Sequence, residues 1–508
     1  MGIFPFVLCI LYYVLHITLR RFRRARRLSG YGPPAYPVIG CLVAFYKNRS
    51  RLLNWYTDLL TESPTQTIQI RRLGAPRTVV TANPKNVEYM LKTNFNNFPK
   101  GKPFTEILND FLGRGIFNVD GDLWYNQRKL VSHEFSAKSL KDYVEKNLTE
   151  ELDKKLIPIF ESLAMQGDQK VVDLQELLRR LGFDTVCKFS LGIDPCSLDH
   201  ALSDAPILKA FDTAALISAR RATAPISYQW KIKRMLGAGT EQVLKDAVKE
   251  IHAFVTNIIR DRREKISSNA KSHGEDLLSR MIMAGHEEEV VRDMMISFIM
   301  AGRDTTSAAM TWLFYSLSRH SHIEEELVKE IGCVEDQELA HYGALKELRL
   351  LEACICETMR LYPPVAWDSK HAIVDDLLPD GTPVGAGDRV TYFPYGMGRM
   401  ENLWGKDRLE FRPERWFVEP NEGRRGELKK ESLFKFPVFQ AGPRVCLGKE
   451  LALIQMKYVV ASILKRFEIR PVGSEQAVFV PLLTAHMAGG FKVTVRRRQP
   501  HMAMSLKI

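Results

Sequence analysis

One short loop near the C-terminus constrains this chain of 508 residues more than any other segment. Residues 439–448 read Phe-Gln-Ala-Gly-Pro-Arg-Val-Cys-Leu-Gly, which places Cys446 between Gly442 and Gly448 and ahead of a helical run. Glycine permits backbone conformations that are closed to other residues, so the loop can approach a flat group closely. Its backbone N–H groups can also stabilise a thiolate. The loop therefore favours Cys446 as the axial ligand of a haem iron over the alternative of a buried structural cysteine.

A long central helix is predicted over about residues 287–320. Its apolar residues lie on all sides, and it opens with three glutamates and closes with basic residues, as suits the helix dipole. Within it, residues 301–306 read Ala-Gly-Arg-Asp-Thr-Thr, where a glycine, an acid and two threonines are weak helix formers. Either Thr305 and Thr306 bond back to carbonyls one turn earlier, or this segment faces a bound cofactor and serves its chemistry.

Two pairs of side chains lie one helical turn apart. Glu357 and Arg360 place opposite charges on one helix face, and Trp124 and Arg128 reach a common surface. Arg415 follows later, in a Phe-Arg-Pro-Glu-Arg-Trp segment. A solvated arginine beside a core tryptophan is the alternative interpretation of the second pair.

With these motifs, the chain resembles the cytochrome P450 superfamily. The positions that define the haem-thiolate signature of that superfamily are all matched, at Phe439, Gly442, Arg444, Cys446 and Gly448. The resemblance implies a mainly α fold with small β-sheets, in which residues 41–508 form a single large haem-binding unit. It also implies haem b, iron protoporphyrin IX, as the cofactor, with the Cys446 thiolate as axial ligand.

The resemblance also implies distinct tasks for the matching residues. Asp304 and Thr305 would relay protons to dioxygen, while Ala301 and Gly302 would leave room above the haem. The residues expected at the haem propionates are Trp124, Arg128, His371 and Arg444. Those expected in a buried ionic triad behind the cysteine loop are Glu357, Arg360 and Arg415.

A substrate pocket is expected on the open side of the haem. Its walls, carried over by position, are Phe117, Phe211, Ala301, Val365 and Met487, with neighbours in residues 211–217 and 365–367. Residues of these types also suit a protein core. An elongated apolar tunnel that admits only one end of a chain would direct oxidation to a terminal carbon.

The chain shows no strand-flanked Gly-x-Gly-x-x-Gly motif that would bind a dinucleotide. We therefore expect electrons from NADPH to arrive through a separate NADPH–cytochrome P450 reductase. Complementary charge guides such docking, and an acidic partner could meet the basic residues near Cys446, which are Arg128, Lys129, Arg444 and Lys449.

The N-terminus carries an apolar run and then a basic cluster. Residues 3–19 are just long enough to span a bilayer, and arginines in residues 20–27 supply six of the net 12 positive charges. Positive charge that follows an apolar run places the catalytic domain in the cytosol. A membrane anchor also explains the basic cluster, so no nucleic-acid partner is expected. We expect a membrane anchor over residues 1–19, a basic stretch and proline-rich hinge over residues 20–40, and a single-pass location in the endoplasmic reticulum membrane. An interfacial amphipathic helix is the alternative.

Three segments narrow the resemblance further. Residues 183–195, 393–400 and 439–444 look like those of the plant clan that contains fatty-acid ω-hydroxylases and jasmonoyl-amino-acid hydroxylases. We therefore expect NADPH- and O2-dependent hydroxylation of a small lipophilic substrate at or near its terminal methyl group. A fatty acid is favoured, and oxidation can continue to the aldehyde or acid.

Other functions stay open at this point. Within the clan, the alternatives are terminal oxidation of a sterol side chain or of a jasmonoyl-amino-acid conjugate. A haem-thiolate isomerase or dehydratase is disfavoured, because Asp304 and Thr305 would have no use in it. A non-catalytic haem sensor is the remaining class.

Overall fold

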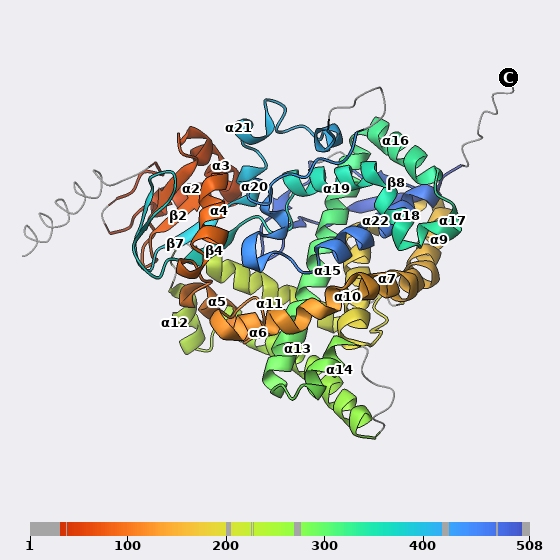
Figure 1. The fold of residues 1–508 in the computed structure, drawn as a ribbon, viewed down its shortest axis with the longest axis horizontal. Helices are drawn as coiled ribbons and strands as arrows, with labels where there is room; N and C mark the ends of the chain where they lie inside the picture. The colour runs from red at the N-terminus through yellow and green to blue at the C-terminus, as the bar shows by residue number, and fades with distance from the viewer. Residues whose placement is uncertain are drawn as a thin grey trace, which may run out of the picture.

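The computed structural model describes residues 31–36, 38–199, 205–224, 226, 228–268, 276–418, 426–473 and 476–499. Helices fill most of the molecule, and strands gather in small sheets at its sides, so the predicted mainly α fold with small β-sheets is confirmed (Figure 1). The expected anchor over residues 1–19 and the basic stretch lie outside the described residues. Within the described ranges, no helix combines the length and the apolar character needed to cross a membrane.

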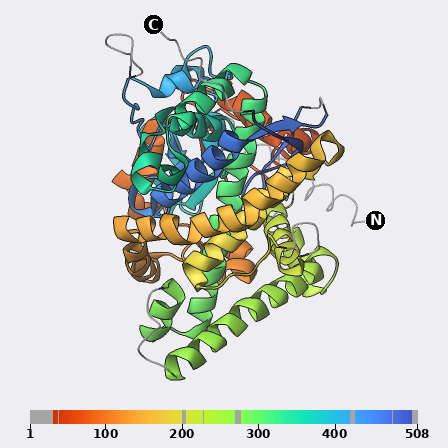
Figure 2. The same ribbon diagram turned by 90° about the vertical axis from the view of Figure 1, so that its right-hand side faces the viewer.

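The α-helices of the described residues fall into two sets by position in the chain, one within residues 42–235 and one within residues 240–466. The first set is α2 (Leu42–Lys47), α3 (Leu52–Glu62), α4 (Pro84–Glu88), α5 (Lys102–Leu112), α6 (Gly121–Ser132), α7 (Ala137–Asp142), α8 (Thr149–Glu151), α9 (Ile157–Gln166), α10 (Leu174–Leu191), α11 (Pro206–Thr223) and α12 (Gln229–Met235). The second set is α13 (Thr240–Ser268), α14 (Leu277–Met283), α15 (Glu288–Ser318), α16 (Ser321–Gly332), α17 (Asp336–Leu339), α18 (Tyr342–Glu347), α19 (Arg349–Leu361), α20 (Pro394–Met397), α21 (Glu401–Trp404) and α22 (Lys449–Arg466). In the turned view, α13 lies at the lower edge of the molecule (Figure 2).

The largest sheet has the strand order β1-β2-β7-β4, formed by Thr67–Ile70, Thr78–Thr81, Arg389–Tyr392 and Asp368–His371. β2 and β7 are parallel, and the other two pairings are antiparallel. The smaller sheets, all antiparallel, are β3-β11-β8 (Val172–Asp173, Lys492–Arg497 and Phe467–Pro471), β5-β6 (Asp376–Leu377 and Pro383–Val384) and β10-β9 (His486–Met487 and Phe479–Val480).

Helix α15 runs through the middle of the molecule and matches the predicted central helix (Figure 1). Acidic residues occupy its first turn, where they interact favourably with the positive end of the helix dipole. The long helix α10 packs along it so closely that a Cβ atom at Gly302 would lie 2.5 Å from Val186 Cγ2. The contact with α10 therefore accounts for this glycine without reference to the haem.

The described part of the proline-rich hinge is fastened to the body of the protein. The carbonyl of Tyr31 accepts a hydrogen bond of 2.8 Å from the backbone N–H of Gln69, and the N–H of Cys41 donates to the Arg71 carbonyl at 2.8 Å. Residues 31–41 therefore lie alongside strand β1 and its extension.

Candidate functional site

The loop that carries Cys446 is shaped by its own backbone. It lies between the short 3-10 helix Pro437–Phe439 and helix α22, and the Cys446 N–H donates a hydrogen bond of 2.8 Å to the Phe439 carbonyl. Gly442 has a φ of +65°, and a Cβ atom there would collide with the Leu91 carbonyl oxygen. The glycine is thus required both by its left-handed conformation and by the neighbouring chain.

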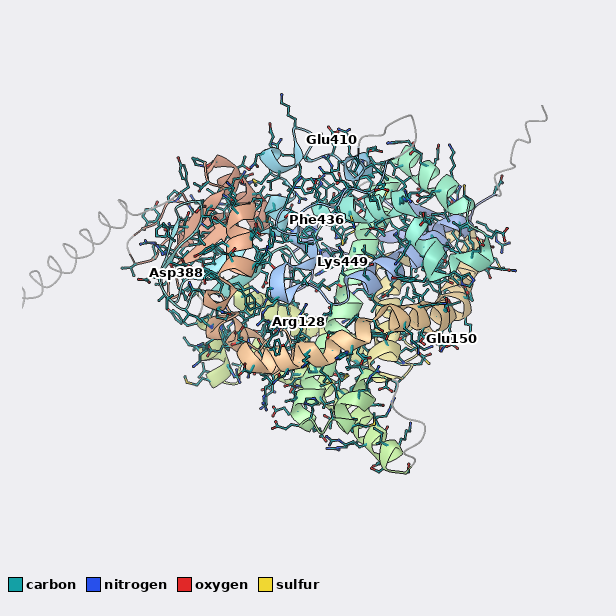
Figure 3. All side chains as sticks on the ribbon, in the orientation of Figure 1. Arg128, Glu150, Asp388, Glu410, Phe436 and Lys449 are labelled. Atoms are coloured by element: carbon teal, nitrogen blue, oxygen red, sulfur yellow. The ribbon has the colours of Figure 1, made fainter. Side chains whose placement is uncertain are left out.

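Cys446 is exposed, yet enough protein surrounds its sulfur for burial to raise the pKa of the thiol. The Gly448 N–H, Arg128 and Lys449 oppose that rise by favouring the thiolate. A side chain that is surrounded by protein and still accessible faces the interior of the molecule. Figure 3 shows Arg128 and Lys449 on either side of this central region.

A buried carboxylate fastens the cysteine loop to the largest sheet. Asp368 on β4 accepts hydrogen bonds from Lys100 Nζ (2.5 Å), Lys370 Nζ (3.0 Å), Gln440 Nε2 (3.0 Å) and Tyr392 OH (3.1 Å). Burial alone would raise the pKa of Asp368, but the two ammonium groups lower it well below its usual range. Burial lowers the pKa of Lys370 to about 7 despite this pairing. Because Gln440 belongs to the loop, the network fixes the loop's position against β4 and β7.

Trp124 and the two predicted arginines form a stack beside this network. The guanidinium carbon of Arg444 lies 4.5 Å from the centroid of the Trp124 ring, and that of Arg128 lies 5.9 Å from it. Arg444 Nη2 donates to Asp120 Oδ1 at 2.7 Å, while its buried Nε has no partner among the described residues. Arg128 Nη2 donates to the Val445 carbonyl at 2.7 Å, next to the cysteine.

His371 completes the predicted propionate-binding set. Its Nδ1 lies 2.6 Å from the Lys100 carbonyl oxygen, so in the neutral ring this nitrogen carries the proton. Its Nε2 is buried and has no partner within the described part of the chain. Burial lowers the pKa of His371 to about 4. A nearby anion would raise that pKa and turn Nε2 into a donor.

These residues fit a haem. Positive charge exceeds negative charge, since Lys100, Lys370 and Arg444 lie around the carboxylates of Asp120 and Asp368, and Arg128 lies beside Arg444. Arg444 Nε and His371 Nε2 are buried nitrogens that lack a partner among the described residues, as two groups awaiting the propionates would be. Lys100 and Lys370 were not predicted from the sequence. The available signal was the i, i+2 spacing of Asp368 and Lys370, which puts opposite charges on one face of a strand.

The segment of α15 predicted to serve catalysis has one open face. Phe298, Ala301, Gly302 and Thr305 are partly exposed, at i, i+3, i+4 and i+7, although most of the helix is buried. The Thr305 hydroxyl donates to the Ala301 carbonyl at 2.7 Å, and Thr306 donates to Gly302 at the same distance. Each hydroxyl can still accept a second hydrogen bond.

Asp304 lies beside a pair of arginines that hold another acid. Arg179 on α10 and Arg303 on α15 both donate to Asp212 on α11. Their nitrogens lie 3.7 Å and 3.5 Å from Asp304, and Asp304 Oδ1 has no hydrogen-bond partner among the described residues. Asp304 and Thr305 therefore make no hydrogen bond to each other in this state, and the acid is held only loosely.

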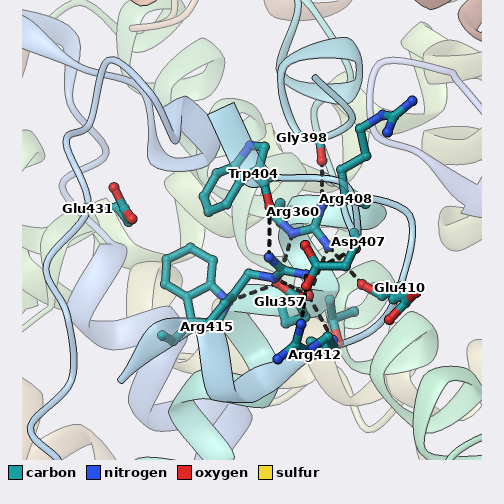
Figure 4. A network of polar contacts seen from close by, with 12 residues as sticks. Glu357, Arg360, Gly398, Trp404, Asp407, Arg408, Glu410, Arg412, Arg415 and Glu431 are labelled. Atoms are coloured by element: carbon teal, nitrogen blue, oxygen red, sulfur yellow. Dashed lines mark hydrogen bonds and ion pairs between the residues drawn. The ribbon is translucent and has the colours of Figure 1, made fainter. Parts of the chain in front are cut away.

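The three residues of the predicted triad come together in one polar network (Figure 4). Arg360 Nε and Nη2 each donate to the Glu357 carboxylate at 2.8 Å, and Arg415 Nε donates to it at 2.8 Å. The indole N–H of Trp416 donates to the same carboxylate at 2.9 Å. Glu357 and Arg360 are fully buried, so their charges depend on one another.

The five predicted pocket residues lie in different surroundings. Phe211 packs against Phe111 at 6.0 Å and is buried in a core cluster, and Met487 is buried in another. Phe117 is exposed, and Ala301 and Val365 are half-buried.

The described part of the chain encloses a pocket of about 960 Å³. It is bounded by α2, α3, the C-terminal part of α11, α12 and residues 476–481. Ile217 and Trp367, from two of the predicted segments, contribute to its wall, whereas none of the five named residues does.

Known proteins match this chain over almost all of its described length. A family model described as Cytochrome P450 matches residues 31–485. Cytochrome P450 94B1 of Arabidopsis thaliana is 56% identical over 94% of this chain and 93% of its own. Cytochrome P450 94A1 of Vicia sativa is 41% identical over 92% and 90%, respectively. Cytochrome P450 CYP94D108 of Paris polyphylla is 42% identical over 89% of each chain.

Proposed function

Because the chain belongs to the cytochrome P450 family and is a haem-thiolate monooxygenase, we propose that it hydroxylates a fatty acid at or near its terminal methyl group. The observation that carries this proposal is the 960 Å³ pocket, whose wall includes Trp367, Tyr395 and Phe479. Aromatic walls of this kind favour a long apolar ligand, because they bury its surface with little loss of side-chain freedom.

The haem supplies the activation of dioxygen when it is bound. In the proposed reaction, Thr305 accepts a hydrogen bond on its free lone pair, and Asp304 passes protons from solvent to the space above the cofactor. The loose hold on Asp304 supports this role, since its Oδ1 has no partner in the described structure. Trp124, Arg128, His371 and Arg444 would hold the propionates.

A separate reductase is proposed to deliver electrons from NADPH near Cys446. Lys129 is exposed and Lys449 is half-buried, which leaves both amines free to meet an acidic partner. Arg128 and Arg444 are already engaged, with the Val445 carbonyl and with Asp120. We also propose an anchor over residues 1–19 that places the enzyme in the endoplasmic reticulum membrane, where lipid substrates are concentrated.

Turnover by microsomes that contain the protein, a plant reductase and NADPH tests this function. The substrates are fatty acids, jasmonoyl-amino-acid conjugates and hydroxysterols, and mass spectrometry identifies the oxidised carbon and the oxidation level. Terminal hydroxylation of fatty acids is the expected result. A preference for the conjugates or the sterols would replace the substrate and leave the reaction class unchanged. Absence of NADPH-dependent turnover, in protein that shows a thiolate-type spectrum with carbon monoxide, would contradict the proposal.

A further inference from the structure

The inner wall of the pocket is a connected set of aromatic rings. Tyr362 stacks on Trp312 of α15 with ring centroids 4.2 Å apart, and Tyr395 lies 5.3 Å from Phe479. Phe479 also lies 6.3 Å from Tyr362, so these four rings are in continuous contact. Stacked and edge-on rings restrain one another. The wall therefore has a fixed shape and carries few charges of its own.

One cation, Arg399, is set into this aromatic wall. Its guanidinium carbon lies 3.6 Å from the centroid of the Tyr395 ring, and its Nη1 donates to the Tyr395 carbonyl at 3.1 Å. Burial lowers the pKa of Arg399, and the groups that counter this effect are the hydroxyls of Tyr395 and Tyr362. Arginine nonetheless stays charged in proteins. No carboxylate of the described residues pairs with it, so an enclosed positive charge lacks its counter-charge.

The other arginines at this pocket differ from Arg399. Arg221 Nη1 donates to Asp110 Oδ2 at 2.8 Å, and Arg221 also pairs with Glu241. Arg51 pairs with Asp58 at 2.7 Å, and both side chains are half exposed. Arg220 also borders the pocket but is exposed to solvent, which screens its charge. Arg399 alone combines enclosure, access to the pocket and the lack of an acidic partner within the described structure.

Helix α15 relates Arg399 to the reacting region. Trp312 lies seven residues after Thr305, which is two helical turns along the same face and about 10 Å along the axis. Tyr362 stacks on Trp312, and Tyr362 and Tyr395 are the aromatic neighbours of Arg399. Trp312, Ala308 and Ala309 are themselves buried, so a chain with one end at Arg399 would run past the rings that cover this part of α15 to reach Thr305. The separation suits a molecule whose acidic group and oxidised carbon are at opposite ends.

We propose that Arg399 binds the carboxylate of the substrate, which makes the enzyme selective for long-chain acids over esters, alcohols and sterols of similar size. This inference rests on the proposed function and adds the residue that recognises the acid group of the substrate. The planar guanidinium can offer two parallel N–H groups to a carboxylate, and the surrounding rings exclude water from the pair. The far end of the bound chain then carries the methyl group toward the open face of α15.

Binding can be measured on the haem-loaded protein through the change in haem absorbance when a ligand enters the site. The probes are dodecanoic acid and its methyl ester, which differ in charge but hardly in shape. We expect the wild-type protein to bind the acid about 10- to 100-fold more tightly than the ester, as charge-assisted hydrogen bonds would give. Equal affinity for acid and ester would overturn the inference, and this comparison needs no variant.

Variants then locate the effect. Arg399→Gln should weaken binding of the acid by about 10- to 100-fold and leave the ester unchanged, while Arg399→Lys should retain part of the preference. Arg220→Gln, at the exposed border of the same pocket, is the matched control and should change the affinity for the acid less than about 3-fold. A preserved thiolate-type spectrum with carbon monoxide shows that each variant is folded around its haem. An Arg399→Gln variant that binds the acid like the wild type would place the recognition elsewhere.

The outcomes separate this inference from the proposed function. If fatty acids are hydroxylated at the terminal carbon but binding does not depend on Arg399, the inference fails and the function stands. If the acid binds through Arg399 but only another class of lipid is oxidised, the function fails and the anion site remains.

Discussion

Two carboxylates in this protein occupy opposite kinds of surroundings. Glu357 is fully buried, and Arg360 donates to both of its oxygens at 2.8 Å. Asp304 is only half-buried, the nearest nitrogens of Arg303 and Arg179 lie 3.5 Å and 3.7 Å away, and Oδ1 has no hydrogen-bond partner in the described structure. A carboxylate held on all sides cannot exchange protons without disturbing its scaffold, whereas a loosely held one can. We therefore expect Glu357 to matter for stability and Asp304 for proton transfer.

The largest expected effect is the loss of stability in Glu357→Gln. The substitution leaves the buried Arg360 with no carboxylate partner among the described residues, while Arg415 keeps only Asp407, at 3.2 Å. We therefore expect the free energy of unfolding to fall by about 3–5 kcal/mol. Urea unfolding followed by circular dichroism measures it. Glu401→Gln is the matched control, because Glu401 pairs with Arg408 at 2.7 Å on the surface and should cost less than about 1 kcal/mol. Similar losses of stability in the two variants would mean that burial does not determine how much each acid contributes to stability.

Asp304→Asn tests the other half of the comparison. The amide keeps the shape of the side chain but cannot carry protons, so we expect product formation to fall by about 100-fold. The free energy of unfolding should change by less than about 1 kcal/mol, because Arg179 and Arg303 both keep Asp212 as their closer acidic partner. Product formation per NADPH consumed and urea unfolding are measured on the same preparation. An Asp304→Asn variant that unfolds as readily as Glu357→Gln would make Asp304 a second structural acid.

The neighbouring threonines provide a narrower test of the same region. Thr305 and Thr306 donate equivalent hydrogen bonds of 2.7 Å to carbonyls one turn earlier, but only Thr305 lies on the open face of α15. Thr305→Val and Thr306→Val therefore remove the same intrahelical bond. We expect Thr305→Val to lower product formation by about 10-fold while NADPH consumption continues, and Thr306→Val to stay near the wild type. Equal losses would point to a general effect on the helix.

Spacing alone predicted the residues whose partners are close along the chain, whereas Arg415, 58 residues from Glu357, was expected there only from the resemblance to a known family. Glu357 and Arg360 are three residues apart on one helix, and the cysteine loop is a single continuous segment. Sequence spacing also indicated the central helix, because its apolar residues and acidic start are local features. In these cases, local spacing already determines which side chains can meet.

The features that the sequence missed depend on distant segments. Asp368 is paired with Lys100 and Gln440, which are 268 and 72 residues away. Gly302 was interpreted as room above the haem, yet Val186 on another helix requires it. Arg399 lies in the segment 393–400 that supported the resemblance, but nothing in the sequence showed that its neighbours in the fold are aromatic rings. Sequence periodicity does not indicate whether the fold places an acidic partner beside a given arginine.

The smallest predicted effect concerns two histidines that, unlike Glu357, bury no charge. Burial lowers the pKa of His371 and of His252 to about 4, whereas an unfolded histidine titrates near about 6.5. Between these values the unfolded chain binds a proton that the folded protein does not. Stability therefore rises with pH from about 4 to about 6.5 and is lost as the pH falls through this window.

Bound haem would change the pKa of only one of these two histidines. A propionate beside His371 would raise its pKa toward the unfolded value and remove its share of the pH dependence, while His252 on α13 would keep its own. In the haem-loaded protein, His252→Gln should therefore reduce the stability difference between about pH 7 and about pH 4.5 by roughly 1 kcal/mol, and His371→Gln should leave it nearly unchanged. Urea unfolding at the two pH values measures both. If His371→Gln flattens the profile as much as His252→Gln does, no anion lies against His371, and the propionates are held by the arginines and Lys100 alone.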